Sequence, residues 1–310
     1  MSKKSFISKI EELYLNFTKH DYMDSKEKVE ERLSKGQSTE KPVKSIFKSI
    51  DSNGMQVFRF GDENAENTIV YIHGGAFIGE INYQHFLYCY LLSRKLDAYV
   101  LAPVYPLAPK HSANETFNLM TDFYKDLTSS RSNIVLMGDS AGGGFVLSFC
   151  QYIKTIDLPQ PDEIIVFSPW VDIGMSNPPY DNESDPILGE VGLREMGKSW
   201  AGDWSLDDYR VSPTFGDNKD LPKMIIFAGD NEIFHKDIVS YVEKLEEDGV
   251  DVKFVVAEGM FHIYPLFPSP EARAAFKIIK EEFKEWTDKK DRWNNYKIIK
   301  KLNLKKFKKR

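Results

Sequence analysis

One serine of this sequence lies in a setting that could make it a nucleophile. Ser140 stands between glycines in the stretch 138–143 (Gly-Asp-Ser-Ala-Gly-Gly), immediately after the apolar run 133–137. The apolar run predicts a buried strand, and the glycines allow the tight strand-to-helix turn that exposes a serine hydroxyl. Because a serine hydroxyl alone is a poor nucleophile, the chain must also supply a base, an orienting acid and an oxyanion site.

Three other predicted strands are followed by segments that could supply these parts. In chain order, the segments are the glycine pair after His73, the stretch Gly-Asp-Asn-Glu at 229–232, and the stretch that contains His262. In a parallel sheet, ligand-binding residues gather at the carboxyl ends of the strands. We therefore expect these segments to meet around Ser140.

Three side chains in these segments would carry acyl transfer. Ser140 would attack a carbonyl carbon, and His262 would take the serine proton and later pass it to the leaving alcohol. Glu232 would accept a hydrogen bond from the other imidazole nitrogen, which fixes the tautomer and stabilises the imidazolium. Asp230 and Asp237 are the alternatives for the acid.

The negative charge of a tetrahedral intermediate requires hydrogen-bond donors that are already in place. The backbone N–H groups of Gly74, Gly75 and Ala141 are suited to this role, and loss of one such donor typically costs about 3 kcal/mol of transition-state stabilisation. We expect His73 to shape the oxyanion loop rather than to react.

Four apolar side chains are candidates for the wall of an acyl or alcohol pocket. They are Phe77, Trp170, Trp200 and Met260. The alternative is that they form the core of a cap, because aromatic side chains bury large apolar areas. The sequence has no HExxH-type metal spacing, phosphate-binding loop or dinucleotide fingerprint, so we expect no metal and no cofactor.

Eight apolar or alternating runs predict strands, and helical patterns separate the later ones. This alternation is typical of βαβ units in a mainly parallel sheet. A final helix is predicted to begin near Pro270, with apolar residues at helical spacing as far as Trp286. The predicted strands cover residues 45–50, 55–60, 68–72, 98–104, 133–137, 163–168, 223–228 and 251–257.

Two segments are expected to form a helical cap over this sheet. Residues 1–43 are charged and helix-prone, and their apolar spacing predicts an amphipathic helix pair that docks on the rest of the protein. The insertion at about 171–215 is too long for a bare connection. The catalytic domain would then span residues 44–288, followed by a basic tail at 289–310.

Composition and charge limit the partners. The 310 residues are 42% hydrophobic and carry a net charge of −6, so we do not expect nucleic acid as a partner. The tail at 289–310 contains eleven Lys or Arg and one Asp, a net charge of +10. We interpret it as a solvated, frayed terminus, with weak contact to an anionic membrane surface as the alternative. A homodimer is compatible with the sequence.

The remaining features favour a cytoplasmic protein. The first residues do not form a signal peptide, because Glu11 and Glu12 follow the early lysines where an apolar core would be needed. No apolar run approaches membrane-spanning length. Cys89 and Cys150 lie in apolar helical patterns, which predicts buried thiols rather than a disulfide.

Over about residues 66–287 the sequence resembles the hormone-sensitive-lipase-like esterases, a branch of the α/β-hydrolase fold. The resemblance implies an eight-stranded, mostly parallel sheet flanked by helices, with an antiparallel second strand and a helical cap. It also implies the chain order serine, acid, histidine. The matching motifs are His73-Gly74-Gly75, Tyr105-Pro106-Leu107-Ala108-Pro109, 138–143, Ser168-Pro169-Trp170-Val171-Asp172, Asp185-Pro186, 229–232 and Phe261-His262.

These observations predict a serine carboxylic-ester hydrolase that acts on short- to medium-chain acyl esters. Two features depart from the family's usual pattern: Ala76 stands where a third glycine is usual, and the acid is Glu232 where many relatives have Asp. The extra methyl group would narrow the pocket. An acyltransferase or amidase on the same triad, or a non-catalytic small-molecule receptor of the same fold, are the alternatives.

Overall fold

The computed structural model describes residues 4–18, 21–35, 43–180 and 185–307, and for residues 18, 21, 22 and 289–307 it describes the backbone alone. Its centre is one eight-stranded sheet in the order β1-β2-β4-β3-β5-β6-β7-β8. Strand β2 is antiparallel to both neighbours, and every other neighbouring pair is parallel, which confirms the expected topology. The strands are β1 Ser49–Ser52, β2 Met55–Phe60, β3 Asn67–Ile72, β4 Ala98–Pro103, β5 Ile134–Asp139, β6 Glu163–Phe167, β7 Met224–Gly229 and β8 Val252–Ala257.

Strands β3 to β7 are buried at every position, which explains why they are nearly continuous apolar runs in the sequence. The edge strand β1 differs from its prediction at 45–50. It begins only at Ser49, and its side chains are mostly exposed. The apolar Phe47 before it packs on Phe60 instead, with 4.9 Å between ring centroids, so its apolar character reflects loop packing rather than a strand.

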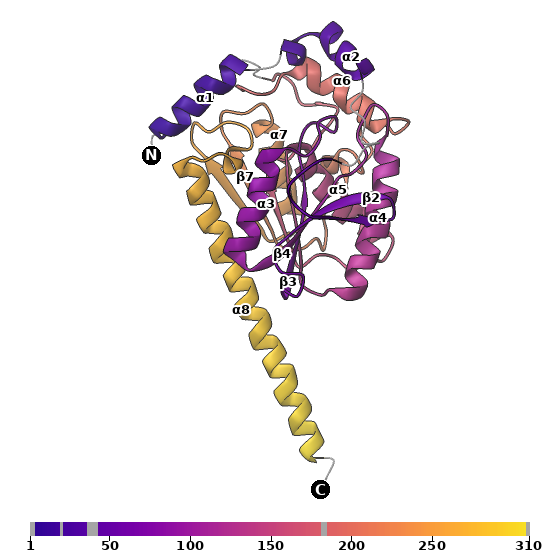
Figure 1. Cartoon of the computed structure of the whole chain (residues 1–310), viewed down its shortest axis with the longest axis vertical. Helices are drawn as coiled ribbons and strands as arrows, with labels where there is room; N and C mark the ends of the chain where they lie inside the picture. The colour runs from indigo at the N-terminus through magenta and orange to yellow at the C-terminus, as the bar shows by residue number, and fades with distance from the viewer. Residues whose placement is uncertain (1–3, 19–20, 36–42, 181–184, 308–310) are drawn as a thin grey trace.

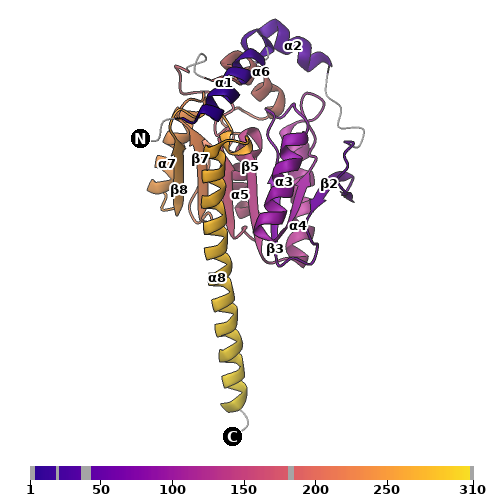
Figure 2. The same ribbon diagram turned by 60° about the vertical axis from the view of Figure 1, so that its left-hand side comes forward.

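Helices cover both faces of the sheet (Figures 1 and 2). Helices α3 (Tyr83–Leu96) and α8 (Pro270–Phe307) lie on one face, and α4 (Ala113–Ser130), α5 (Ser140–Thr155) and α7 (His235–Glu247) lie on the other. Each face has its own apolar cluster. The sheet is therefore the middle of three layers, which leaves its carboxyl edge as the place for a site.

The predicted buried thiols are confirmed. Cys89 lies in the cluster beneath α3, and Cys150 lies in the cluster beneath α5. Both are free and fully buried. They lie on opposite faces of the sheet, so they cannot form an intramolecular disulfide in this fold.

Segments from two distant parts of the chain lie together above the carboxyl ends of the strands (Figure 1). These are η1 (Asp21–Asp24) and α2 (Lys26–Lys35) near the N-terminus, and α6 (Glu190–Ala201) in the long insertion. Both α2 and η1 pack against α6. We call η1, α2 and α6 the cap; a short turn of helix, η2 (Pro213–Phe215), leads from the insertion back towards β7.

Helix α1 (Phe6–Thr18) is less docked than its sequence predicts. Its start is fixed by the hydroxyl groups of Ser5 and Ser8, which donate to Glu271 at 2.9 and 2.7 Å. Its apolar face, however, stays exposed, with Leu13 at 71% and Phe17 at 90%. The amphipathic pattern of α1 therefore does not correspond to a face buried on the rest of the described chain.

Helix α8 also differs from its prediction. It does not end near residue 288 but continues to Phe307, so the backbone of 289–307 is helical rather than frayed (Figures 1 and 2). The basic side chains of this segment lie outside the described residues, as does any membrane contact that they would make.

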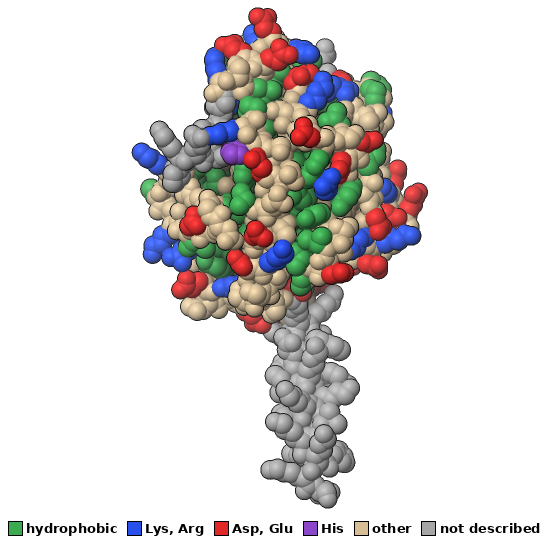
Figure 3. Space-filling model, turned by 90° about the vertical axis from the view of Figure 1, so that its right-hand side faces the viewer, with side chains coloured by type: hydrophobic (Ala, Val, Ile, Leu, Met, Phe, Trp, Pro, Cys, Tyr) green, Lys and Arg blue, Asp and Glu red, His purple; other side chains and the backbone are tan. Residues whose placement is uncertain are grey.

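The surface carries charges of both signs. On the side shown in Figure 3, acidic and basic side chains are interspersed among apolar ones. In the described ranges, no helix combines the length and the apolar character that are needed to cross a bilayer.

The packing of the cap predicts the effect of one substitution. A Cβ atom at Gly192 in α6 would lie 2.8 Å from the Cα atom of Met23 in η1. Because Met23 Cα is a backbone atom, this contact can be relieved only if the backbone of η1 or α6 moves. We expect Gly192→Ala to destabilise the protein by about 1–3 kcal/mol through overpacking. This effect exceeds the gain of up to about 1 kcal/mol that alanine brings to a helix.

Thermal unfolding and proteolysis of residues 21–35 measure this effect. Val191→Ala is the control, because Val191 is the adjacent residue of α6 and is 38% exposed. An increase in stability for Gly192→Ala would mean that α6 does not pack against η1 in solution.

Candidate active site

Ser140 lies at the sharp turn between β5 and α5. Its φ is 52°, in the left-handed region that residues other than glycine rarely adopt. Glycine is required at position 142, because a Cβ atom there would lie 2.1 Å from the carbonyl oxygen of Ile72. The turn thus brings the start of α5 against the end of β3 and presents Ser140 at the carboxyl edge of the sheet.

His262 and Glu232 form a buried pair at the same edge. His262 Nδ1 lies 2.6 Å from Glu232 Oε2, and the two residues are 1% and 4% exposed. They come together because Glu232 follows β7, His262 follows β8, and these strands are parallel neighbours. With its proton on Nδ1, the imidazole has an acceptor at Nε2, and this buried nitrogen has no partner in the described part of the chain.

Glu232 is held by two more hydrogen bonds. Its Oε1 atom accepts from the hydroxyl of Ser168 at 3.0 Å and from the backbone N–H of Gly229 at 2.9 Å. Ser168 in turn accepts from the N–H of Ile263 at 2.9 Å. The Ser168 side chain therefore links the acid to the segment that carries His262. Sequence reasoning assigned it no role, although its position directly after β6 could have indicated one.

The charges around His262 favour its protonated form. Burial acts to lower its pKa, but the hydrogen bond and charge of Glu232, with the charges of Asp185 and Asp139, outweigh burial and raise the pKa. Asp185 accepts hydrogen bonds from two backbone N–H groups of the cap insertion and from the N–H of Ile233 at 3.0 Å. This carboxylate thus ties the insertion to the residue after Glu232, a role that the sequence did not reveal.

A cavity of about 330 Å³ joins the site to the cap. Ser140 and His262 line it on the sheet side together with Gly75 and Ala76. The cap contributes Met23, Arg32 and Met196 to the opposite wall, and the insertion just before α6 contributes Ile187 and Leu188. Apart from Arg32, the wall opposite the hydroxyl and the imidazole is therefore apolar, while charged and polar side chains such as Glu80 and Asn82 line other parts of the cavity.

The oxyanion expectation is corrected at Gly74. Its N–H donates to Asp139 Oδ1 at 3.1 Å and is not directed to the cavity. A Cβ atom at Gly74 would lie 2.3 Å from the same carboxylate, which explains why glycine is needed here. Gly75 and Ala76, by contrast, line the cavity. Ala76 has a φ of 52°, so the loop turns sharply at this residue.

Asp139 is the centre of a buried polar network. Besides Gly74, it accepts from the Tyr71 hydroxyl at 2.7 Å, and His85 Nε2 lies 3.4 Å from its other oxygen. His85 accepts from the N–H of Asn82 through Nδ1, so its Nε2 carries a proton that faces Asp139. Burial acts to raise the pKa of Asp139, but His85 and Tyr71 outweigh it, and the pKa is lowered.

His73 is fully buried and shapes the oxyanion loop, as the sequence predicts. Its Nδ1 donates to the carbonyl oxygen of Gly74 at 2.7 Å, and its carbonyl oxygen accepts from the Tyr105 hydroxyl at 2.7 Å. Burial, helped by nearby His85, lowers the pKa of His73 to about 3. The ring is therefore neutral and holds the loop without carrying charge.

The four residues expected to line the pocket do not do so. The described residues that line the cavity at Ser140 do not include Phe77, Trp170, Trp200 or Met260. Instead Phe77 stacks on Trp200, with 4.1 Å between ring centroids and 2° between planes, and also lies against Trp170. Met260 packs on the opposite face of the sheet. The aromatic residues thus form core that joins the oxyanion loop to the cap.

The two alternative acids have other partners. Asp230 accepts from the N–H of Gly259, and Asp237 accepts from the Tyr180 hydroxyl at 2.9 Å. Burial raises the pKa of Asp237 to about 6. Glu232 alone of the three is hydrogen-bonded to His262 in the described structure.

A nucleophile turn after β5, an acid after β7 and a histidine after β8 are the arrangement of an α/β hydrolase. Residues 69–266 match the family described as having the α/β hydrolase fold. The chain is 31% identical over 227 residues to an esterase of Acinetobacter venetianus, covering 70% of this chain and 75% of the relative. It is 27% identical over 197 residues to a triacylglycerol lipase of Mycobacterium tuberculosis, covering 63% of this chain and 41% of that lipase.

Solved structures of other proteins have the same fold. A hormone-sensitive lipase from a metagenome library superimposes with a TM-score of 0.75 at 22% identity, covering 90% of this chain and 98% of that one. The chain therefore belongs to the α/β-hydrolase family. It is a hydrolase of the esterase and lipase type.

The interaction between Glu232 and His262 predicts how the pKa of His262 changes when Glu232 loses its charge. In Glu232→Gln the charge that raises the pKa of His262 is removed while burial remains, so we expect this pKa to fall. NMR titration of the His262 ring measures the change, and Asp230→Asn and Asp237→Asn are matched controls that should leave it nearly unchanged. A larger fall in either control would assign the acid to that residue instead.

Proposed function

We propose that the protein is a serine carboxylic-ester hydrolase that forms an acyl-enzyme on Ser140. The observation that carries the proposal is the buried pair of His262 and Glu232. The Nε2 atom of His262 has no partner in the described structure, and the His262 ring lines the same cavity as Ser140. Membership of the α/β-hydrolase family and the similarity to an esterase support ester hydrolysis as the reaction class.

In the first half-reaction, Ser140 Oγ attacks the ester carbonyl carbon while its proton passes to His262 Nε2. The imidazolium is stabilised by Glu232, to which it donates through Nδ1. The carbon–oxygen bond to the alcohol then breaks, and the alcohol leaves with the proton from His262. In the second half-reaction, a water molecule gives a proton to His262 and attacks the acyl carbon. The bond between the acyl carbon and Ser140 Oγ then breaks, His262 returns the proton to Oγ, and the carboxylic acid leaves.

For the oxyanion we propose the N–H groups of Gly75, Ala76 and Ala141. The first two are supported by their place in the cavity wall and by the engagement of Gly74 with Asp139. Ala141 is the second residue of α5, and the first N–H groups of a helix have no acceptor within it. These orphan donors and the helix dipole favour negative charge at this point.

We further propose short- to medium-chain acyl groups as substrates. The cavity volume of about 330 Å³ lies at the lower end of the usual range for ligand sites, and its cap wall is apolar at Met23, Leu188 and Met196. Transfer of the acyl group to another acceptor and hydrolysis of an amide would use the same three side chains, so these reactions are distinguished by substrate.

Chromogenic esters of increasing chain length test the mechanism. We expect Ser140→Ala and His262→Ala each to lower kcat/KM by about 10⁴-fold or more, because the triad acts as a unit. The wild type should prefer acyl chains of fewer than about ten carbons. Ser148→Ala is the matched control, because Ser148 is buried in the same helix and does not line the cavity. Full activity of Ser140→Ala would rule out this nucleophile.

The methyl group of Ala76 provides a separate test. Because Ala76 lines the cavity and its φ of 52° suits glycine, Ala76→Gly should fold normally and enlarge the space beside Ser140. We expect the ratio of kcat/KM for branched to straight acyl esters to increase several-fold. An unchanged ratio would show that the methyl group does not face the acyl chain.

A further inference from the structure

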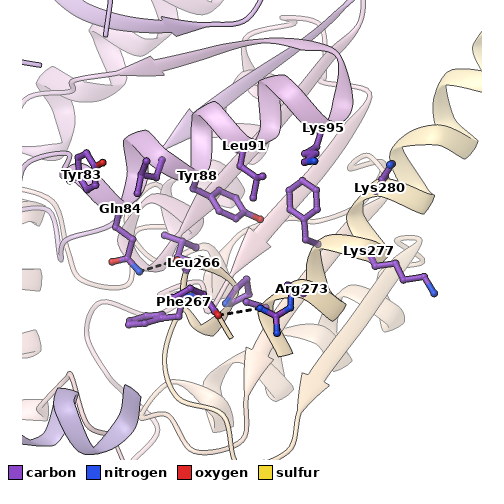
Figure 4. Close-up of a pocket in the computed structure, with 15 residues that line it drawn as sticks. Tyr83, Gln84, Tyr88, Leu91, Lys95, Leu266, Phe267, Arg273, Lys277 and Lys280 are labelled. Atoms are coloured by element: carbon purple, nitrogen blue, oxygen red, sulfur yellow. Dashed lines mark hydrogen bonds between the residues drawn. The ribbon is translucent and has the colours of Figure 1, made fainter. Parts of the chain in front are cut away.

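A second cavity lies on the face of the sheet that α3 and α8 cover. It is a groove of about 820 Å³ between these two helices and η3 (Tyr264–Leu266), and Ser140 is not among the residues that line it (Figure 4). Most of the side chains that line it are apolar, and several are exposed, with Leu87 at 46% and Leu91 at 36%. The apolar lining residues include Leu87, Tyr88 and Leu91 of α3 and Phe276 of α8.

The groove is elongated, and the charged side chains that line it are all basic. Tyr83 and Lys95 line its two ends on α3 and are separated by about 18 Å at a rise of 1.5 Å per residue. Its charged lining residues are Lys95, Arg273, Lys277 and Lys280, and no acidic side chain lines it among the described residues. Lys277 pairs with Glu281 at 3.7 Å, outside the lining.

Two of the basic side chains have no partner and share one end of the groove. Figure 4 shows Lys95 and Lys280 at the end opposite Tyr83 and Gln84. Both are exposed, and neither forms an ion pair or hydrogen bond within the described part of the chain. An elongated apolar surface that ends in two unpaired ammonium groups suits a ligand with a long apolar chain and an anionic head.

One tyrosine that lines the groove has a buried hydroxyl group. Tyr88 lines the groove, is 5% exposed and points from α3 toward α8 (Figure 4). Its hydroxyl has no hydrogen-bond partner in the described structure. An unsatisfied buried hydroxyl costs about 1–3 kcal/mol.

We propose that this groove binds a single-chain anionic amphiphile, a long-chain carboxylate. Its alkyl chain lies along α3 between Leu91 and Phe276, and its carboxylate lies at Lys95 and Lys280. The proposal does not depend on the reaction at Ser140, because the binding site is built from other side chains. Gln84 is the one described residue that lines both the groove and the Ser140 cavity, and its amide donates to the Leu266 carbonyl at 3.2 Å.

Calorimetric titration of the full chain with dodecanoate, below its micelle concentration, tests the proposal. We expect one bound dodecanoate per chain in the wild type. Reversing the charge in the double variant Lys95→Glu/Lys280→Glu should weaken binding by about tenfold or more, which is about 1.4 kcal/mol. Leu87→Asp should weaken it similarly, because it places a negative charge beside the alkyl chain. Butyrate should not bind detectably, and dodecyltrimethylammonium should bind at least about tenfold more weakly than dodecanoate.

Matched controls lie outside the groove. Lys125→Glu/Lys219→Glu makes the same change in net charge at exposed positions, and Ile156→Asp introduces a carboxylate at an apolar residue that is 38% exposed. All of the altered side chains are at least partly exposed, and thermal unfolding verifies that each variant folds. The control variants should bind dodecanoate as the wild type does.

Three results would overturn the proposal. Binding that the groove variants leave unchanged would place dodecanoate elsewhere, including the Ser140 cavity. Equal affinity for dodecyltrimethylammonium would remove the role of the lysines. The third result combines two observations: the wild type does not bind dodecanoate, and sedimentation equilibrium shows a dimer that Leu87→Asp dissociates. This result would assign the groove to a second copy of the chain.

Discussion

The buried carboxylate of Asp139 is the interaction on which the geometry of the site depends. A charge that is 1% exposed is stable only if it is paired and hydrogen-bonded, and its partners come from three different parts of the chain. Tyr71 donates from β3, Gly74 donates from the loop after β3, and His85 faces it from α3. Because Asp139 is also the residue before Ser140, satisfying this charge fixes the loop that carries Gly75 and Ala76 relative to the serine. The carboxylate that holds the site together is thus distinct from the carboxylate that orients the histidine.

The buried carboxylate of Glu232, like that of Asp139, depends on hydrogen-bond donors around it. Glu232 is buried, and it is stable there because Ser168, Gly229 and His262 all donate to it. Ser168 and His262 follow β6 and β8, and Gly229 is the last residue of β7, so three parallel strands that end at one edge supply the partners of Glu232. The result is an imidazole fixed through Nδ1, with its pKa raised against the effect of burial. Asp185 extends the network into the cap insertion, which means that the position of the cap and the position of the acid are set together.

The sequence predicted what depends on local pattern and missed what depends on the approach of distant segments. The strand ends could be placed because buried parallel strands are continuous apolar runs, and residues after them must lie at one edge. In the structure Glu232 and His262 are hydrogen-bonded, and Ser140 and His262 line one cavity. The direction of the Gly74 N–H could not be predicted, because it is set by a carboxylate that is distant in the sequence. Phe77 and Trp200 were expected to face substrate for a related reason: composition cannot distinguish an aromatic residue that lines a cavity from one that stacks on another beneath it.

That aromatic stack changes how specificity would arise. Phe77 has a φ of 62° and lies directly after the oxyanion loop, and its ring is parallel to that of Trp200 in α6. Trp170, after β6, packs on Phe77 and on Phe234, which lies in the segment after Glu232. The rings therefore connect the oxyanion loop, the cap and the acid segment in one rigid core, where substitution would disturb all three. The wall opposite Ser140 contains flexible or branched aliphatic side chains instead, among them Met23, Leu188 and Met196. Because these side chains can change without disturbing the buried network, the acyl group accepted by the proposed esterase could vary in size while the positions of Ser140 and His262 stay constant.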